Sequence, residues 1–170
     1  MFTKLNITEF DVIFSIMKKS FPLDEYRPYD EQKALFDNQY YNVYAEKEDA
    51  VKGFIAVWDF NSFVYIEHFA VDPSHRNGGV GSSILRDIAK KYGHNLCLEV
   101  ELPNSDVSVR RIEFYKRCGF YYNDYPYVQP PISKGKKEVP LKLMTDGNQI
   151  DNKSFNMIKE ILYTKVYNVI

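Results

Sequence analysis

The chain has 170 residues, of which 45% are hydrophobic and 26% charged, and its 22 basic and 23 acidic side chains leave a formal net charge of -1. A chain of this size can bury a core, and we expect one domain over residues 1–170. The balanced charge argues against nucleic acid or a membrane surface as the main partner.

The sequence also bears on the compartment in which the protein works. No basic segment followed by an apolar run opens the chain, and no apolar run approaches about 18 residues. Cys97 and Cys118 lie in apolar stretches without metal-ligand spacing, which favours buried thiols in a reducing compartment. We therefore expect a cytoplasmic protein.

The first half of the chain is expected to place two helices before a run of strands. A short strand over residues 2–7 precedes an amphipathic helix over residues 8–20, with Thr8 as its N-cap. A proline-interrupted connector leads to a second short helix over residues 30–38. Aromatic and β-branched residues then predict three strands. These strands cover residues 40–47, 51–60 and 62–72.

The second half alternates helices with strands. A helix over residues 79–92 ends at Gly93, which is typical of the position after a helix C-terminus. The further elements are a strand at 95–102, a helix at 105–119, strands at 120–128 and 138–145, and a helix from about 151. This order predicts a mixed α/β sheet. The apolar stripe of the last helix must pack on its own sheet or on a second copy of the chain.

The stretch Arg76–Gly81, "RNGGVG", lies between a strand and a helix. Its last four positions, 78–81, contain three of the chain's eight glycines. One interpretation is a turn in which glycine supplies positive φ. A dinucleotide or P-loop cradle does not fit, because neither spacing is met and no lysine follows the glycines. The third interpretation is a phosphate site, where amides at a helix N-terminus bind an anion.

The longer segment "FAVDPSHRNGGVGSSIL" resembles the acetyl-CoA-binding segment of the GNAT acetyltransferase superfamily, in which a strand ending in Val precedes [RQ]-x-x-G-x-[GA] and a helix. "RRIEFYKRCGF", with Tyr115, Gly119 and Phe120, resembles the second hallmark of that family. The resemblance implies a GNAT fold over about residues 1–145. This fold has a mixed central sheet splayed between its fourth and fifth strands and helices on both faces. Residues from about 151 to 170 would add a C-terminal helix.

The same resemblance implies acetyl-CoA as the acetyl donor. The pantetheine arm would bond to the backbone of the strand before the glycines, and the pyrophosphate would rest on the amides after Arg76. Arg76 would contact phosphate or shape the loop. Ser108 and Arg111 stand where many relatives have Asn and Ala. The residues expected to bind acetyl-CoA are Phe69, Ala70, Val71, Arg76, Asn77, Gly78, Gly79, Val80, Gly81, Ser82, Ser108 and Arg111.

Acetyl transfer to an amine needs a base and profits from an acid. The resemblance assigns the acid to Tyr115, whose alternative role is that of a core tyrosine. For the base we favour Glu67 slightly over Glu99, while either carboxylate could instead be part of an ion pair. His68 should point to the opposite face of its strand from Glu67. Neither it nor His75 nor His94 has metal-ligand spacing, so no metal is expected.

In this fold the acceptor would lie beside the connector between the first two helices and the loop between the last strands. The residues expected to contact it are Phe21, Glu25, Tyr26 and Tyr125. Acidic and aromatic side chains suit a cationic amine, although the same segments could be ordinary solvated loops.

The sequence therefore predicts an N-acetyltransferase that acts on the primary amine of a small cationic molecule, as a monomer or homodimer. The alternatives are an acetyltransferase for protein N-termini or lysines, and a non-catalytic sensor of acyl-CoA. An acyl donor longer than acetyl stays open.

Overall fold

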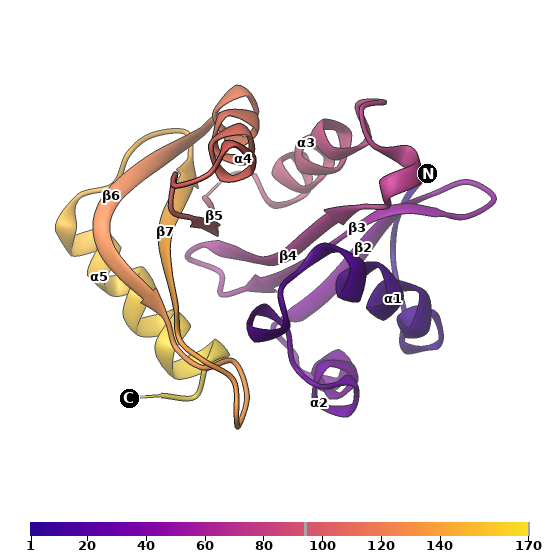
Figure 1. The fold of residues 1–170 in the computed structure, drawn as a ribbon, viewed down its shortest axis with the longest axis horizontal. Helices are drawn as coiled ribbons and strands as arrows, with labels where there is room; N and C mark the ends of the chain where they lie inside the picture. The colour runs from indigo at the N-terminus through magenta and orange to yellow at the C-terminus, as the bar shows by residue number, and fades with distance from the viewer. Residues whose placement is uncertain (94, 170) are drawn as a thin grey trace. The chain divides into compact units, whose positions relative to one another are not determined.

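The structure is a computed structural model that describes residues 1–93 and 95–169 (Figure 1). The chain folds into two compact units, the first made of Met1–Pro22 with Pro28–Cys97 and the second of Leu23–Arg27 with Leu98–Ile170. That residues 1–170 act as a single domain stays a prediction. Among the helices that the structure describes, none has both the length and the apolar character needed to cross a membrane.

The first unit is built on a sheet whose strands follow one another in chain order. Its antiparallel strands are β1 (Phe2–Lys4), β2 (Tyr41–Lys47), β3 (Val51–Asp59) and β4 (Val64–Val71). Strand β5 (Leu96–Glu101) begins beside β4, where the Val64 amide donates to the Asn95 carbonyl at 2.9 Å. A helix connects β4 to β5, which is the crossover that parallel neighbours require. The mixed sheet predicted from the element order is confirmed.

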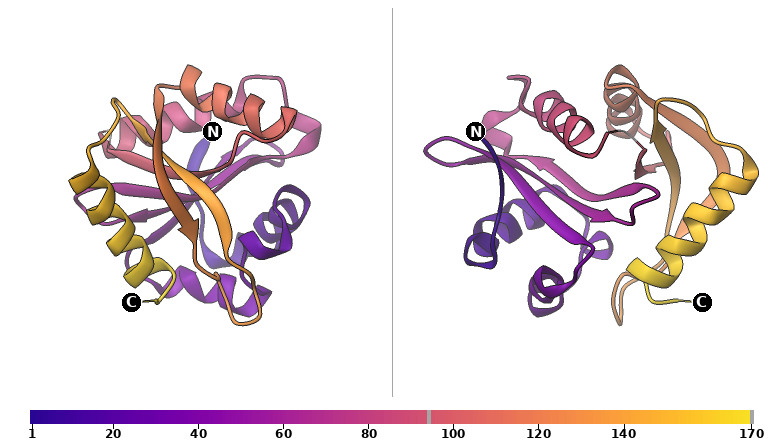
Figure 2. Two further views of the ribbon diagram at one scale, coloured as in Figure 1. Left: turned by 60° about the vertical axis from the view of Figure 1, so that its left-hand side comes forward. Right: turned by 180° about the vertical axis from the view of Figure 1, so that it is seen from behind.

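Three helices cover the two faces of this sheet (Figures 1 and 2). Helices α1 (Phe10–Ser20) and α2 (Tyr29–Ala34) lie on one face, and α3 (Val80–Tyr92) lies on the other. The apolar residues of α1 and α3 recur at helical spacing and are buried, as the sequence predicts. Short 3₁₀ turns occur at Ile7–Glu9, Leu23–Glu25, Leu35–Asp37 and Pro73–His75.

The predicted N-cap of the first helix is wrong. Asn6 is the cap, because its side chain accepts a hydrogen bond from the Thr8 amide at 2.9 Å. The Glu9 carboxylate accepts from the Asn6 amide in return, which completes a capping box. A 3₁₀ turn precedes α1, so the helical region begins earlier than the hydrophobic periodicity indicates.

Gly53 on β3 allows α3 to pack closely on the sheet. A Cβ atom at this position would lie 2.9 Å from the carbonyl oxygen of Ala70 and 3.0 Å from Cδ1 of Ile84. Side chains larger than hydrogen would therefore push β4 or α3 away. This contact fixes where α3, and with it the glycine-rich loop, begins above the sheet.

The second unit carries the remaining strands and helices. Its strand order is β5, β7 (Val139–Asp146) and β6 (Phe120–Gln129), and β6 and β7 are antiparallel. Its helices are α4 (Asp106–Arg117), α5 (Asn152–Ile161) and the π-helical segment η5 (Leu162–Val166).

The register of β6 shifts between Asn123 and Tyr127. Pro126 lies in this interval, and proline cannot donate to a strand ladder. The buried amide of Asn123 donates to the carbonyl of Leu143 at 3.2 Å, and its oxygen accepts from the Ile150 amide at 2.9 Å. This side chain therefore ties the irregular strand to the segment that leads into α5.

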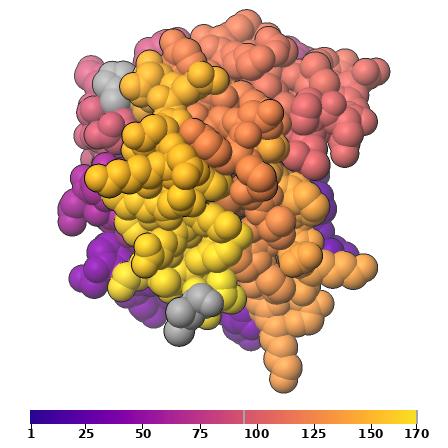
Figure 3. Space-filling model, turned by 90° about the vertical axis from the view of Figure 1, so that its left-hand side faces the viewer, coloured from indigo at the N-terminus to yellow at the C-terminus, as the bar shows by residue number. Residues whose placement is uncertain are grey.

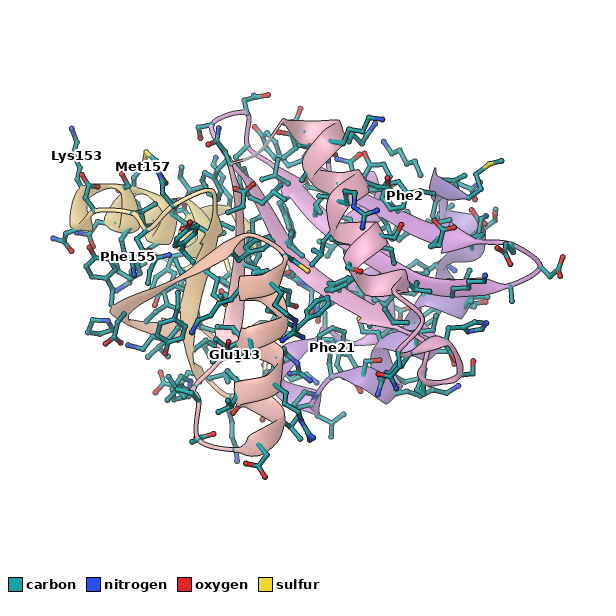
Figure 4. The ribbon with its side chains drawn as sticks, turned by 90° about the horizontal axis from the view of Figure 1, so that it is seen from above. Phe2, Phe21, Glu113, Lys153, Phe155 and Met157 are labelled. Carbon is teal, nitrogen blue, oxygen red and sulfur yellow. The ribbon has the colours of Figure 1, made fainter. Side chains whose placement is uncertain are left out.

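The C-terminal helix packs on the strands of its own unit. The ring of Phe155 stacks on that of Tyr125 with centroids 4.7 Å apart, and the Tyr163 hydroxyl donates to the carbonyl of Val128. Phe155 points toward the strands, whereas Lys153 and Met157 point away (Figure 4). Figure 3 shows α5 and β6 side by side on the surface. Of the two alternatives for the apolar stripe, the structure shows docking on its own sheet.

Candidate active site

The glycine-rich loop leads directly into α3 of the first unit. Asn77 and Gly79 have left-handed backbones, with φ of 67° and 78°, and Gly79 immediately precedes the helix. Gly79 thus fits the interpretation of a turn that needs positive φ. Gly81 does not, because it lies within α3, where glycine is about 1 kcal/mol less favourable than alanine. Gly81 therefore calls for an explanation other than backbone conformation.

The N-terminus of α3 has the geometry of an anion site. Its cap residue is a glycine and supplies no side-chain acceptor for the first-turn amides. The helix is 13 residues long, and its dipole places partial positive charge at this end. Residues 76–79 are exposed and residues 80–83 are half-buried, so a ligand from solvent can reach this end of the helix. This arrangement fits the phosphates of a coenzyme.

Arg76 ties the loop to the end of β4. Its Nε donates to the carbonyl oxygen of Val71 at 3.2 Å. The guanidinium keeps four other N–H groups, so shaping the loop and contacting phosphate are compatible roles. The family resemblance implies that the backbone of Val71 bonds to the pantetheine arm of acetyl-CoA. The Val71 carbonyl oxygen already accepts a hydrogen bond from Arg76, and its second lone pair could accept another.

Glu67 occupies a bulge in β4. Ala56 of β3 pairs with His68 and the next residue, Val57, pairs with Ile66, so Glu67 is the extra residue. The alternation of faces is broken there, and His68 Nδ1 lies 3.5 Å from Glu67 Oε2. The expectation that these side chains point to opposite faces is therefore wrong, because it assumed a regular strand.

The ring of Phe21 completes this cluster in the first unit. It meets the His68 ring edge-on, with centroids 5.0 Å apart and an interplanar angle of 73°. Phe21 lies just after α1 (Figure 4). An expected acceptor residue, Phe21, and the favoured base, Glu67, are thus brought together through His68.

In the second unit, Glu99 of β5 is held by two tyrosines. The Tyr127 hydroxyl donates to Glu99 Oε1, and the Tyr167 hydroxyl lies 2.8 Å from both carboxylate oxygens. Both tyrosines are buried. Sequence reasoning missed them, because the 14 tyrosines of the chain offer no local signal for which of them meets a carboxylate.

Tyr115 is a buried residue of α4. Burial raises the pKa of its hydroxyl to about 12, and the nearby Arg111 partly opposes this shift. Its ring packs edge-on against Phe120 at 5.8 Å. Tyr115 therefore keeps its proton at neutral pH, as a proton donor must.

Ser108 and Arg111, also on α4, have local partners. The Ser108 amide donates to Ser105 Oγ at 3.1 Å in a capping box, and Ser108 is almost completely buried. Arg111 forms an ion pair with Glu101 at 3.1 Å. These contacts stabilise the start of α4 and its link to β5, and contact of either residue with acetyl-CoA stays a prediction.

The remaining residues expected at the acceptor lie in the second unit. Glu25 ends a 3₁₀ turn and is half-buried. Tyr26 is buried, with Lys136 Nζ 5.2 Å above its ring. The Tyr125 hydroxyl donates to the carbonyl of Ile150 at 3.1 Å. The ammonium group of Lys136 thus already lies over one face of the Tyr26 ring, and acceptor binding by these residues stays a prediction.

The structure describes residues 1–93 and 95–169. Within these residues no group of three or more His, Cys, Asp or Glu side chains could hold a metal ion. His94 lies outside the described residues.

Comparison with known proteins identifies the class. The model of the acetyltransferase (GNAT) family matches residues 10–120. A structure assigned to the GNAT acetyltransferases, from Bacteroides thetaiotaomicron, shares 33% sequence identity with this chain. The likeness covers 100% of this chain and 99% of the other, with a TM-score of 0.92.

Two more distant structures share the fold. One is a chimera of the Vibrio cholerae spermidine N-acetyltransferase with hSSAT, at 16% identity and TM-score 0.62, covering 85% of this chain and 93% of its own. The other is the Escherichia coli ribosomal-protein-S18-alanine N-acetyltransferase, at 17% identity and TM-score 0.62, covering 89% and 97%. Among proteins with curated functions, none matches the sequence significantly.

These likenesses define the fold as that of the N-acetyltransferases. Because the family model matches residues 10–120 and the relative from Bacteroides thetaiotaomicron is 33% identical over the whole chain, the chain belongs to the GNAT acetyltransferase family. The family resemblance carried by the glycine stretch and the Tyr115 segment is confirmed.

Proposed function

We propose that this protein transfers an acetyl group from acetyl-CoA to the primary amine of a small cationic molecule. The observation that carries the proposal is the start of α3, where uncapped amides follow an exposed loop and Gly81 has no conformational reason to be glycine. A glycine in a first helical turn allows close approach of a ligand to the backbone. A pyrophosphate is the anion that this site suits.

The acceptor amine must lose a proton before it attacks. At pH 7, freeing an amine whose pKa is about 10.4 costs roughly 4.6 kcal/mol. We assign this proton to Glu67, whose carboxylate is withdrawn from solvent beside His68, either directly or through a water molecule. Glu99 is the alternative base.

The neutral amine then attacks the thioester carbonyl carbon. A C–N bond forms, the C–S bond breaks, and the electron pair leaves with sulfur as a thiolate. A thiol pKa of about 8.5 makes this thiolate a fair leaving group. Tyr115, which burial keeps protonated, is proposed to donate the proton that yields free coenzyme A.

The preference for a cationic acceptor rests on Glu99. Two phenolic hydroxyls stabilise its ionised form, and because phenols are neutral they leave its negative charge in place. A fixed carboxylate of this kind can bind an ammonium group of the acceptor. The fold does not choose the acceptor, since a spermidine acetyltransferase and a ribosomal-protein acetyltransferase share it.

Two alternative functions, a protein acetyltransferase and an acyl-CoA sensor, would give different results in an assay. A protein N-terminus or lysine as acceptor would give turnover with peptides and none with small amines. A sensor would bind acetyl-CoA without turnover, and the protonated Tyr115 and the solvent-shielded Glu67 argue against it. A cytoplasmic location and the absence of a catalytic metal belong to the proposal and rest on the sequence.

A thiol-release assay with acetyl-CoA and a panel of amines and peptides tests the proposal. We expect coenzyme A to be released fastest with small cationic amines. Binding of acetyl-CoA without release by any acceptor would overturn the proposal in favour of the sensor. Release with peptides alone would favour the protein acetyltransferase.

A further inference from the structure

We propose that Tyr167, just after η5, is a positioning residue that holds the Glu99 carboxylate in its working orientation. The inference rests on the proposed function in one respect, which is that Glu99 binds an ammonium group of the acceptor. It adds that the C-terminal segment takes part in the site through this contact.

The geometry around Glu99 supports this role. The Tyr167 hydroxyl is 2.8 Å from both Oε1 and Oε2, and the Tyr127 hydroxyl donates to Oε1 from strand β6. Hydrogen bonds to an ionised acceptor are about twice as strong as neutral ones. Donors from two separate elements therefore restrict the rotation of the glutamate side chain and fix the plane of its carboxylate.

The backbone before Tyr167 is irregular in a way that sets its direction. The Tyr167 amide donates to the carbonyl of Leu162 at 3.1 Å, five residues back, which is the pattern of a π-helix. One extra residue in the turn rotates the following side chain by about 100° relative to a continuous α-helix. Such π segments are rare and occur frequently at functional sites.

A buried arginine fixes the residue next to Tyr167. Arg27 Nη2 donates to the carbonyl of Val166 at 3.2 Å, and Arg27 is only 5% exposed. Val166 and Tyr167 are themselves buried. The end of η5 is therefore anchored at two points, by Arg27 at the backbone of Val166 and by Glu99 at the side chain of Tyr167, which follows the segment.

The test is a double-mutant cycle that combines Tyr167→Phe with Glu99→Gln. Tyr167→Phe removes the hydroxyl and keeps the ring, and we expect kcat/KM for the acceptor amine to fall about 10-fold while KM for acetyl-CoA is unchanged. In the Glu99→Gln background the same change should cost less than about twofold, because the group that Tyr167 positions is gone. Tyr121→Phe is the control, since it removes the hydroxyl of an exposed tyrosine on β6 and should leave kcat/KM nearly unchanged.

Urea unfolding of the same four proteins supplies a readout that needs no activity. We expect the two substitutions to be non-additive in stability, as for residues in direct contact. Equal losses of kcat/KM from Tyr167→Phe in both backgrounds, or an equal loss from Tyr121→Phe, would overturn the inference. So would wild-type turnover in Glu99→Gln. If the wild-type protein releases no thiol from acetyl-CoA, the proposed function is wrong. Urea unfolding still tests the contact between Tyr167 and Glu99 in that case, and additive losses of stability would overturn it.

Discussion

Nδ1 of His68 lies 3.5 Å from Oε2 of Glu67, and the two side chains are only 2% and 1% exposed. The β4 bulge brings these neighbours together, and the ring of Phe21 packs against His68. Both side chains are thus withdrawn from solvent and lie against each other on β4. That Glu67 of this pair takes a proton from the acceptor amine is part of the proposed function, and the following substitution tests it.

Replacing Glu67 by Gln should lower kcat by about 10²-fold or more and remove the acidic limb of the pH–rate profile. Glutamine keeps the shape of the side chain and cannot accept the proton. The profile of kcat/KM against pH is the measurement. A matched control is Glu113→Gln, because Glu113 forms an exposed ion pair with Lys116 on α4 (Figure 4).

Glu113→Gln should leave kcat and its pH dependence close to wild type. Retention of the acidic limb in Glu67→Gln, together with its loss in Glu99→Gln, would move the role of base to Glu99. Retention in both would mean that neither carboxylate is the base.

Local patterns in the sequence predict most elements of the fold. Hydrophobic spacing predicts α1 and α3, Gly93 ends α3 in a left-handed conformation, and the order of helices and strands predicts the mixed sheet. These features depend on neighbours within a few positions along the chain, which is the range that periodicity and capping rules describe.

The features that the sequence could not provide depend on more distant partners. The bulge at Glu67 arises from the pairing of β4 with β3, so alternation along β4 alone assigns His68 to the wrong face. The partners of Glu99 lie 28 and 68 residues away along the chain. No spacing rule connects residues at such separations, and a carboxylate in a strand does not indicate which tyrosine it meets.

Gly81→Ala separates coenzyme binding from folding. Because Gly81 is helical, alanine should stabilise the fold by about 0.5–1 kcal/mol and raise Tm by about 1–4 °C. A methyl group on the anion-binding turn should nevertheless weaken acetyl-CoA binding. Calorimetric titration with acetyl-CoA and a thermal melt measure the two effects.

Gly135→Ala is the converse control, because Gly135 has φ of 82° in a different loop. This substitution should destabilise the fold by about 1 kcal/mol and leave acetyl-CoA affinity unchanged. If Gly81→Ala binds acetyl-CoA as tightly as wild type, the phosphate site at α3 is wrong.

Tyr115→Phe should lower kcat while acetyl-CoA binding is nearly unchanged, since the hydroxyl is needed for proton donation.

The dependence of folding stability on pH provides a second test of Tyr115. The pKa of Tyr115 rises from 10.0 to about 12 on folding, so the unfolded chain loses this proton first as pH rises. Tyr115 therefore contributes stability that is present below pH 10 and is lost between pH 10 and about 12, by up to about 2–3 kcal/mol.

Urea unfolding across this alkaline range measures the effect. Tyr115→Phe should show a shallower decline in stability than wild type. Identical declines would mean that the hydroxyl is not buried as described, and unchanged turnover would remove Tyr115 from the mechanism.

Phe155→Ala tests the docking of α5. Phe155 is 4% exposed and stacked on Tyr125, so truncation should cost about 3–5 kcal/mol. Met157→Ala, on the exposed side of the same helix, should cost less than about 0.5 kcal/mol. Thermal melts of the two variants give the comparison, and equal melting temperatures would contradict the packing of α5 on β6.

The most direct measurement of the central claim compares two acceptors of matched length, putrescine and γ-aminobutyrate, by thiol release from acetyl-CoA. Both carry a primary amine, and their far ends differ in being an ammonium or a carboxylate. We expect kcat/KM to be at least about tenfold higher for putrescine. The fixed carboxylate of Glu99 attracts the far ammonium group of putrescine and repels the carboxylate of γ-aminobutyrate. An equal or higher kcat/KM for γ-aminobutyrate would contradict it.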